Sequence, residues 1–391
     1  MHTPLRYPTT TVGSWPRSPE LLRALRDRRY DRIGEEEFDR IADAACLQAL
    51  EAQHRAGIDI VTDGEMRRDN FYSFVSDKLA GVEMLSLAEL LDHVEDKASF
   101  EEILGTLDAP ASLIMNPTAR AKVERQRPLA LDELRFLRQH TDRPVKIPLP
   151  GPYLLTRAMW VEGLSTDAYP SKEDLAEDVV AILRAELQEL AAAGVEYVQF
   201  DEPVLTELVF SRRLGARTFM CAALATRRDP EEELAFAVDL INAVVAGISG
   251  PNIGLHVCRG NWSTREEVLL AGEYPPLMPW LAKLRVDQLV LEYATPRAGG
   301  LDALGAVADR EIGLGVVNPR TEQVEPVDEI VGRIDEAARF VPPERLYLNP
   351  DCGFGTFSRR PMNTPEVAEA KLANMVEAAR VLRKRPAPAN V

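Results

Sequence analysis

The sequence has little cysteine, little histidine and few aromatic residues. Its 391 residues include 4 cysteines, 5 histidines and 6% Phe, Trp and Tyr. So few cysteines in so long a chain exclude a disulfide scaffold, and the simplest location is the cytoplasm, where cysteines more often bind metal, catalyse or lie buried. We interpret Cys46 and Cys221 as buried, unreactive thiols.

The sequence also lacks a basic excess and a long hydrophobic run. The 46 basic side chains are outnumbered by 62 acidic ones, giving a net charge of −16. Nucleic acids and anionic membranes bind basic surfaces, so we expect neither as a partner. No apolar run approaches the length that spans a bilayer, and the start MHTPLRYPTTTVG does not have the pattern of a signal peptide. With 46% hydrophobic residues, the chain can bury a large core.

Apolar, β-rich runs alternate with amphipathic segments along the chain. We predict eight strands, near Thr9–Pro16, Ile58–Glu65, Val145–Pro150, Val195–Asp201, Ile253–Cys258, Gln288–Glu292, Ile312–Val317 and Leu346–Asn349. Runs such as VKIPL and RLYLN are almost wholly apolar, as is typical of strands covered on both faces. This alternation most economically makes an α/β fold of the (β/α)8 TIM barrel type, with a doubly wound sheet as the alternative.

The spacing of the predicted strands suggests one catalytic barrel domain over residues 1–391. About 80 residues separate the second strand from the third, and we interpret approximately 76–140 as an insertion on the barrel. We expect a frayed tail over 384–391. A helix should begin after Ser171 and stop at Gly194, and the last helix should begin at Thr364 and Pro365.

The strongest chemical signal is the segment GLHVCRGNW. His256 and Cys258 are two residues apart on a strand, so their side chains share a face at the end where barrel enzymes place their sites. Such residues are often only part of the core. However, Glu292 ends the sixth strand and Cys352 follows the eighth, and a buried carboxylate needs a cation or hydrogen bonds. One His, two Cys and one Glu would complete a tetrahedral zinc site.

A second group of candidates is rich in carboxylates. The second and fourth strands end in VTDGEMRRDN and VQFDEPVL, which contain Asp63, Glu65, Asp201 and Glu202. Helix capping or loop solvation would account for about half of them. The functional interpretation is that one or two of them point into the barrel mouth and hold a substrate ammonium group. Gly13 and Ser14, at the end of the first strand, would offer N–H and hydroxyl groups to a carboxylate.

These segments resemble the catalytic barrel of the cobalamin-independent methionine synthase family. The matching motifs are TTTVGSWPR, VTDGEMRRDN, QFDEPVL, GLHVCRGNW, LEYATP, GLGVVNPRT and LNPDCGFGT, in the family's order. The resemblance implies a zinc-dependent S-methyltransferase that forms methionine from homocysteine. It implies zinc held by His256, Cys258, Glu292 and Cys352. The homocysteine amino group would lie near Glu65 and Asp201, and its carboxylate near Val12, Gly13 and Ser14.

Two departures from the family pattern concern the methyl donor. Where the family has a Trp that supports the folate, this chain has Ala158, with Trp160 two residues on. The family's proton-transferring histidine aligns with Arg320, and we expect Arg320 and Asp201 to be the catalytic residues. Methyltetrahydrofolate must be protonated as it leaves, and an arginine does not release a proton. We therefore expect a methylcorrinoid, free or bound to a protein, to be a better donor than methyltetrahydrofolate.

Three other functions are compatible with the sequence. A related enzyme type, the epoxyalkane:coenzyme M transferases, alkylates a different thiol, but two carboxylates would repel the coenzyme M sulfonate unless Arg259, Arg297 or Arg320 reverses the local charge. A zinc hydrolase typically has a His-x-His pair on the first strand, and TTTVGSWP has no histidine. A non-catalytic zinc scaffold rarely places its metal at a barrel mouth.

Overall fold

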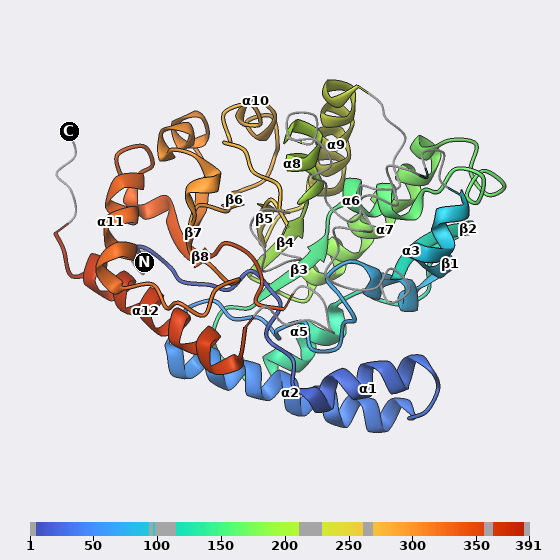
Figure 1. Ribbon diagram of the computed structural model, residues 1–391, viewed down its shortest axis with the longest axis horizontal. Coiled ribbons are helices and arrows are strands. Elements are labelled where there is room, and N and C mark those ends of the chain that lie inside the picture. The colour runs from blue at the N-terminus through green and yellow to red at the C-terminus, as the bar shows by residue number, and fades with distance from the viewer. Residues whose placement is uncertain are drawn as a thin grey trace.

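The structure is a computed structural model, and it describes residues 5–93, 97, 115–210, 229–260, 269–355 and 363–386. The strands are β1 (Leu79–Ser86), β2 (Met115–Arg125), β3 (Lys146–Pro150), β4 (Tyr197–Asp201), β5 (Asn252–Val257), β6 (Gln288–Leu291), β7 (Glu311–Val317) and β8 (Leu346–Pro350). Figure 1 shows β3 to β8 at the centre of the molecule, with α-helices around them.

The helices connect and cover the strands. The α-helices are α1 (Pro19–Arg29), α2 (Glu35–Ala56), α3 (Leu87–Leu90), α5 (Leu131–Arg138), α6 (Pro152–Met159), α7 (Lys172–Ala192), α8 (Val204–Phe210), α9 (Pro230–Val245), α10 (Met278–Leu281), α11 (Val327–Ala337) and α12 (Pro365–Arg383). The 3-10 helices are η1 (Ser73–Lys78), η2 (Leu91–His93), η7 (Pro296–Ala298), η8 (Leu301–Val307) and η9 (Pro343–Arg345). None of these described helices is long and apolar enough to cross a membrane.

The parallel strands close into a barrel. β3 to β8 form one sheet in chain order. The ring is completed by three isolated parallel bridges, which join Thr9 to Leu348, Thr10 to Ile60, and Val61 to Val145. The two ends of the sheet therefore meet through the first two predicted strand segments. The predicted (β/α)8 barrel is confirmed, and the doubly wound sheet, which would leave two open edges, is excluded.

The first two barrel segments are much shorter than the predicted strands because side chains occupy their backbone groups. The Asp59 carboxylate accepts a hydrogen bond from the Thr9 N–H at 2.8 Å. The Gln53 side-chain oxygen accepts one from the Thr62 N–H at 3.0 Å. These N–H groups are thus not available to a longer ladder between strands, and the segments contribute single bridges.

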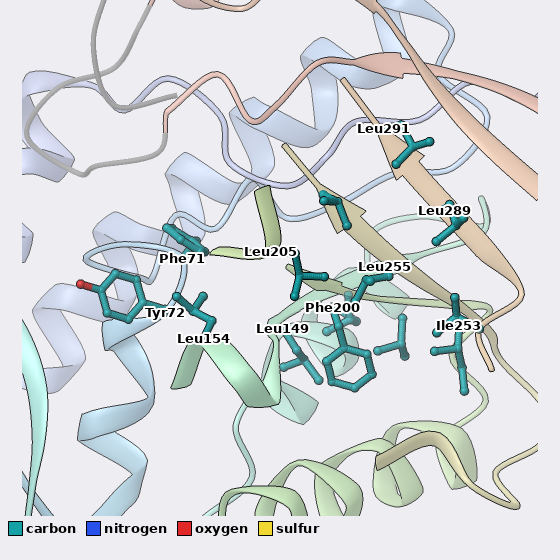
Figure 2. Packing of buried hydrophobic residues seen from close by; sticks show 14 of the residues in the cluster. Phe71, Tyr72, Leu149, Leu154, Phe200, Leu205, Ile253, Leu255, Leu289 and Leu291 are labelled. Carbon is teal, nitrogen blue, oxygen red and sulfur yellow. The ribbon is translucent and has the colours of Figure 1, made fainter. Parts of the chain in front are cut away.

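The barrel strands alternate between apolar residues outside and polar residues inside. Leu149, Phe200, Leu255 and Leu289 are aligned across β3, β4, β5 and β6, and all are fully buried. Figure 2 shows this row of side chains packed together. Because successive side chains of a strand point to opposite faces, Asp201 and its aligned neighbour His256 project to the barrel interior.

The segment between Val61 and β3 carries a small second sheet. β1 and β2 pair in antiparallel fashion, with an irregularity at Gly81, whose φ is +79°. A Cβ atom there would lie 2.2 Å from the Lys122 carbonyl oxygen, so the close approach of the two strands requires glycine. Figure 1 places β1, β2 and α3 at the right-hand edge of the molecule. Of the predicted insertion 76–140, residues 94–96 and 98–114 lie outside the described part, and its boundaries stay a prediction.

The helix ends follow the predicted capping residues. The Ser171 hydroxyl accepts from the Asp174 N–H at 3.2 Å, and the Thr364 hydroxyl accepts from the Val367 N–H at 3.3 Å. Gly194, with a φ of +77°, follows α7 in the left-handed conformation that glycine adopts easily. The segment Leu301–Val307 forms the 3-10 helix η8 rather than an α-helix. Most of the predicted frayed tail, residues 387–391, lies outside the described residues.

Candidate metal and substrate site

Three of the four predicted metal ligands converge at the mouth of the barrel. His256 lies on β5, Cys258 follows the end of β5, and Cys352 lies in the turn after β8. One ligand atom from each residue lies within 4.8 Å of the others, and the two sulfur atoms are 4.0 Å apart. The residues therefore fit a metal that prefers nitrogen and sulfur ligands.

The imidazole of His256 is prepared for a metal by its hydrogen bonds. Its Nδ1 is 3.1 Å from the Val290 carbonyl oxygen, which can only accept, so Nδ1 carries the proton in this contact. Its Nε2 is buried and has no hydrogen-bond partner among the described residues. A buried, unpaired nitrogen beside two sulfur atoms is the arrangement that a metal ion would complete.

The sulfur atoms are charged unequally. The Cys352 thiol donates to Cys258, and this contact lowers the pKa of Cys258 well below its ordinary value, whereas the same contact raises the pKa of Cys352. Burial disfavours a charged His256, but the neighbouring Cys258 thiolate outweighs burial and raises the pKa of His256 to about 9. The site thus concentrates negative charge on sulfur, the form in which cysteine binds a metal.

Glu292, the fourth predicted ligand, lies outside this close group. It directly follows β6 and is only 1% exposed. Its Oε2 accepts from the Arg259 N–H at 2.7 Å, its Oε1 accepts from Arg297, and the Arg320 guanidinium lies 3.8 Å from Oε1. Burial alone would raise its pKa, but Arg297, Arg259 and Arg320 lower the pKa of Glu292 to about 2. The carboxylate is therefore ionised and held by cations. This is also where the structure places Arg320, one of the two predicted catalytic residues.

Glu65 and Asp201 form a second, buried anionic group. Their exposures are 2% and 6%, and Asp201 ends β4. Burial raises the pKa of Glu65 to about 7, and the charge of Asp201 adds to this shift while Arg68 opposes it. Burial also raises the pKa of Asp201 to about 6, and His256 opposes that shift. Glu65 has a φ of +55°, an uncommon backbone conformation for a residue other than glycine. Such an outlier is typical of functional sites.

The other two carboxylates of this group have structural roles. Glu202 accepts from the N–H groups of Tyr153 and Leu154, at 2.8 and 3.0 Å, and so caps the start of α6. Asp63 accepts from the N–H of Glu65 at 2.9 Å and holds the turn after the second barrel segment. The expected helix capping is found for Glu202, whereas Asp63 is only 1% exposed and so does not fit the expected loop solvation.

The segment Val12–Ser14 lies beside Glu65. A Cβ atom on Gly13 would lie 2.3 Å from Glu65 Oε1, so glycine lets this backbone approach the carboxylate. The Ser14 hydroxyl accepts from the Gly355 N–H at 3.2 Å and ties the first barrel segment to the turn after β8. The Val12 carbonyl accepts from Gln199 at 3.0 Å. The structure thus brings this segment, Glu65 and the turn beside Cys352 to one end of the barrel.

Residues 7–381 match the family described as cobalamin-independent synthase, catalytic domain. The chain belongs to the cobalamin-independent methionine synthase family. Curated methionine synthases of Pyrococcus abyssi and Saccharolobus solfataricus are 32% and 27% identical to it. Both matches cover 96% of this chain, with 93% and 95% of the relative. The chain is therefore a methyltransferase, as the resemblance implied.

A solved structure has the same fold as this family member. It is a B12-independent methionine synthase from Shewanella sp. W3-18-1 in complex with selenomethionine, with a TM-score of 0.73 and 23% identity. The match covers 97% of this chain and 98% of the Shewanella chain. This likeness supports the barrel fold over the whole length of the chain.

The position at which the resemblance implies a folate-supporting ring is occupied by Ala158. Ala158 lies in α6 and is fully buried. Trp160, two residues on, directly follows α6 and is 9% exposed, within the hydrophobic core. Arg157, beside Ala158, pairs with Glu207 at 2.9 Å. The apolar and charged side chains at this end of α6 are thus engaged inside the protein.

Three buried polar residues of this region were not among the candidates predicted from the sequence, namely Asp351, Gln199 and Lys146. Asp351 is fully buried, and its Oδ1 accepts from the N–H groups of Tyr293 and Ala294, so it fixes the chain just after Glu292. Its signal was an acidic residue immediately before Cys352. Gln199 and Lys146 could have been recognised because each is a polar residue on the inner face of an otherwise apolar strand.

Proposed function

We propose that this methyltransferase methylates the sulfur of homocysteine at a zinc ion held by His256, Cys258 and Cys352, with Glu292 as the fourth ligand. The observation that carries the proposal is the buried, unpaired Nε2 of His256 beside two sulfur atoms. Two sulfurs and an imidazole suit zinc. The chemistry that zinc supplies when bound is stabilisation of the substrate thiol as a thiolate, which is the nucleophilic form.

Glu292 is the weakest member of the proposed ligand set. Both of its carboxylate oxygens are already engaged, because Arg297 donates to Oε1 and the Arg259 N–H donates to Oε2. Carboxylate oxygen is also harder than the other ligands of this set. Arg320 stays fully charged and holds Glu292 in place, so its proposed contribution is electrostatic.

The substrate's amino group would bind Glu65 and Asp201, and its carboxylate would bind near Val12–Ser14. An ammonium ion favours the ionised form of both carboxylates, whose pKa values burial has raised. Arg259, Arg297 and Arg320 all lie beside Glu292. Their positive charges therefore balance Glu292, which supports a negatively charged site for the ammonium group at Glu65 and Asp201. Coenzyme M has a sulfonate and no ammonium, so the pocket favours homocysteine.

We further propose that the methyl donor is a methylcorrinoid rather than methyltetrahydrofolate. Departure of the folate requires a proton and a platform for the pterin ring. Arg320 cannot supply the proton, and Ala158 has no ring. The β1–β2 sheet at the edge of the molecule is a candidate docking face for such a donor.

Elemental analysis of purified variants tests the metal site. We expect one zinc per wild-type chain, and loss of zinc and of activity together in His256→Ala and Cys352→Ser. Cys46→Ser is the control, because Cys46 is buried in α2 away from this group. Full zinc occupancy in both site variants would overturn the proposal.

A further inference from the structure

Lys146 is a buried lysine inside the barrel, and the mechanism above does not use it. It begins β3, is 2% exposed, and donates from Nζ to the Thr11 carbonyl and to Gln199 Oε1, the latter at 3.0 Å. No carboxylate of the described residues lies within ion-pair distance of Nζ. Burying an ammonium group without a directly paired anion costs free energy. A functional role would explain why a lysine occupies this position.

Gln199 connects Lys146 to the candidate substrate pocket. Its Nε2 donates to Asp201 Oδ1 at 2.8 Å and to the Val12 carbonyl at 3.0 Å. An amide side chain has one donor end and one acceptor end, and Lys146 can only donate. Lys146 therefore fixes the orientation of Gln199, with Oε1 toward the lysine and Nε2 toward Asp201 and Val12.

The charges of this network also favour a particular ligand. Glu65 and Asp201 carry two negative charges when ionised, and Lys146 supplies one positive charge when protonated. One further cation, the ammonium group of an amino acid, makes the pocket neutral. Burial lowers the pKa of Lys146 to about 7, and the charges of Asp201 and Glu65 oppose this shift. The lysine and the two carboxylates therefore interact electrostatically.

We propose that Lys146 is a positioning residue for the amino-acid substrate. Through Gln199 it orients Asp201 and the Val12 carbonyl at the ammonium pocket, and its charge limits that pocket to one ammonium group. This inference rests on the proposed role of Glu65 and Asp201 as the ammonium site. It connects Lys146, in the barrel interior, to the proposed substrate site through the hydrogen bonds of Gln199.

The test compares homocysteine with 4-mercaptobutyrate, which is the same thiol acid without the amino group. Isothermal titration on zinc-loaded protein would give the Kd of both ligands for the wild type, Lys146→Met, Gln199→Met and Lys371→Met. Gln199→Met keeps the lysine and every formal charge, so it carries the test if Lys146→Met does not fold. Lys371→Met is the matched control, because it removes a fully buried lysine that binds Gln323 and Glu325 instead.

We expect the wild type to prefer homocysteine. Lys146→Met and Gln199→Met should each weaken homocysteine binding by about tenfold. Their zinc content should be unchanged, and 4-mercaptobutyrate binding should change by less than about twofold. Lys371→Met should keep the wild-type preference. A wild-type preference in folded Lys146→Met would overturn the inference, and so would a wild-type preference in Gln199→Met. A wild type that does not distinguish the ligands would overturn the ammonium site itself, and this inference with it.

Discussion

Glu65 lies in the barrel mouth with 2% of its surface exposed, and burial raises its pKa from 4.5 to about 7. Between these pH values the folded state holds a proton that the unfolded state has released. The free energy of unfolding should therefore fall as the pH rises through this range. We expect Glu65→Gln to reduce this fall and to be more stable than the wild type above pH 7, while losing homocysteine affinity.

Denaturant unfolding from about pH 4.5 to 8 checks this prediction, since the free energy of unfolding is compared at each pH. Glu36→Gln, at an exposed position on α2, is the control. An unchanged pH dependence in Glu65→Gln would show that the carboxylate is not titrating with the proposed pKa.

Arg297 donates to Oε1 of Glu292, the proposed fourth metal ligand, and so competes with a metal for this carboxylate. In Arg297→Met this competing cation is removed, and a positive charge near the metal is lost. We expect zinc to bind about tenfold more tightly, equivalent to about 1.4 kcal/mol. Competition with a chelator measures the affinity. Arg333→Met is the control, because Arg333 donates to the Tyr293 carbonyl close by. Equal zinc affinity in wild type and Arg297→Met would contradict the proposed competition.

His256, Cys258 and Cys352 could be predicted from sequence because strand periodicity and strand ends place them together. The cation contacts of Glu292 could not, because Arg297 lies in the short 3-10 helix η7 and Arg320 in the turn after β7, and no sequence periodicity describes the path of either segment. Asp351 was missed for a related reason: its partners are backbone N–H groups of another strand end, which have no sequence signature.

At the scale of elements, the start of α6 depends on a contact with the strand next to β3. A Cβ atom on Gly151, the N-cap of α6, would lie 2.1 Å from the Glu202 oxygen that caps this helix. Gly34 is the N-cap of α2, has a similar φ, and has nothing within 4 Å of such a Cβ. We expect Gly151→Ala to cost about 1–3 kcal/mol more than Gly34→Ala in unfolding free energy, because it disturbs buried hydrogen bonds.

Denaturant unfolding of the two glycine variants measures this difference. Equal destabilisation would mean that Glu202 does not cap α6 as the structure shows. The carboxylate itself was among the sequence candidates, but its role depends on a partner about fifty residues earlier in the chain. The shortness of the first two barrel segments had the same kind of cause, since the side chains of Asp59 and Gln53 take their backbone N–H groups.

At the scale of the whole molecule, most of the barrel could be predicted because its apolar runs repeat in a regular order with the helices. Closure of the ring depends on three bridges between segments far apart in the chain, which local patterns do not fix. The single domain and its insertion stay predictions.

The identity of the methyl donor is a property of the whole enzyme. We expect zinc-loaded protein to form methionine from homocysteine faster with methylcobalamin than with methyltetrahydrofolate, because Ala158 and Arg320 stand where the resemblance implies a ring and a proton donor. A side-by-side assay of both donors measures this. Faster turnover with methyltetrahydrofolate would show that the folate site is intact despite these replacements.

The central claim is that a thiol substrate binds a metal at His256, Cys258 and Cys352. Zinc X-ray absorption spectroscopy, with and without homocysteine, tests it most directly. We expect two sulfur ligands in the free enzyme and a third, in place of an oxygen or nitrogen ligand, when homocysteine is added. A zinc hydrolase or a structural zinc site would keep the same ligands, and an unchanged spectrum would contradict the account.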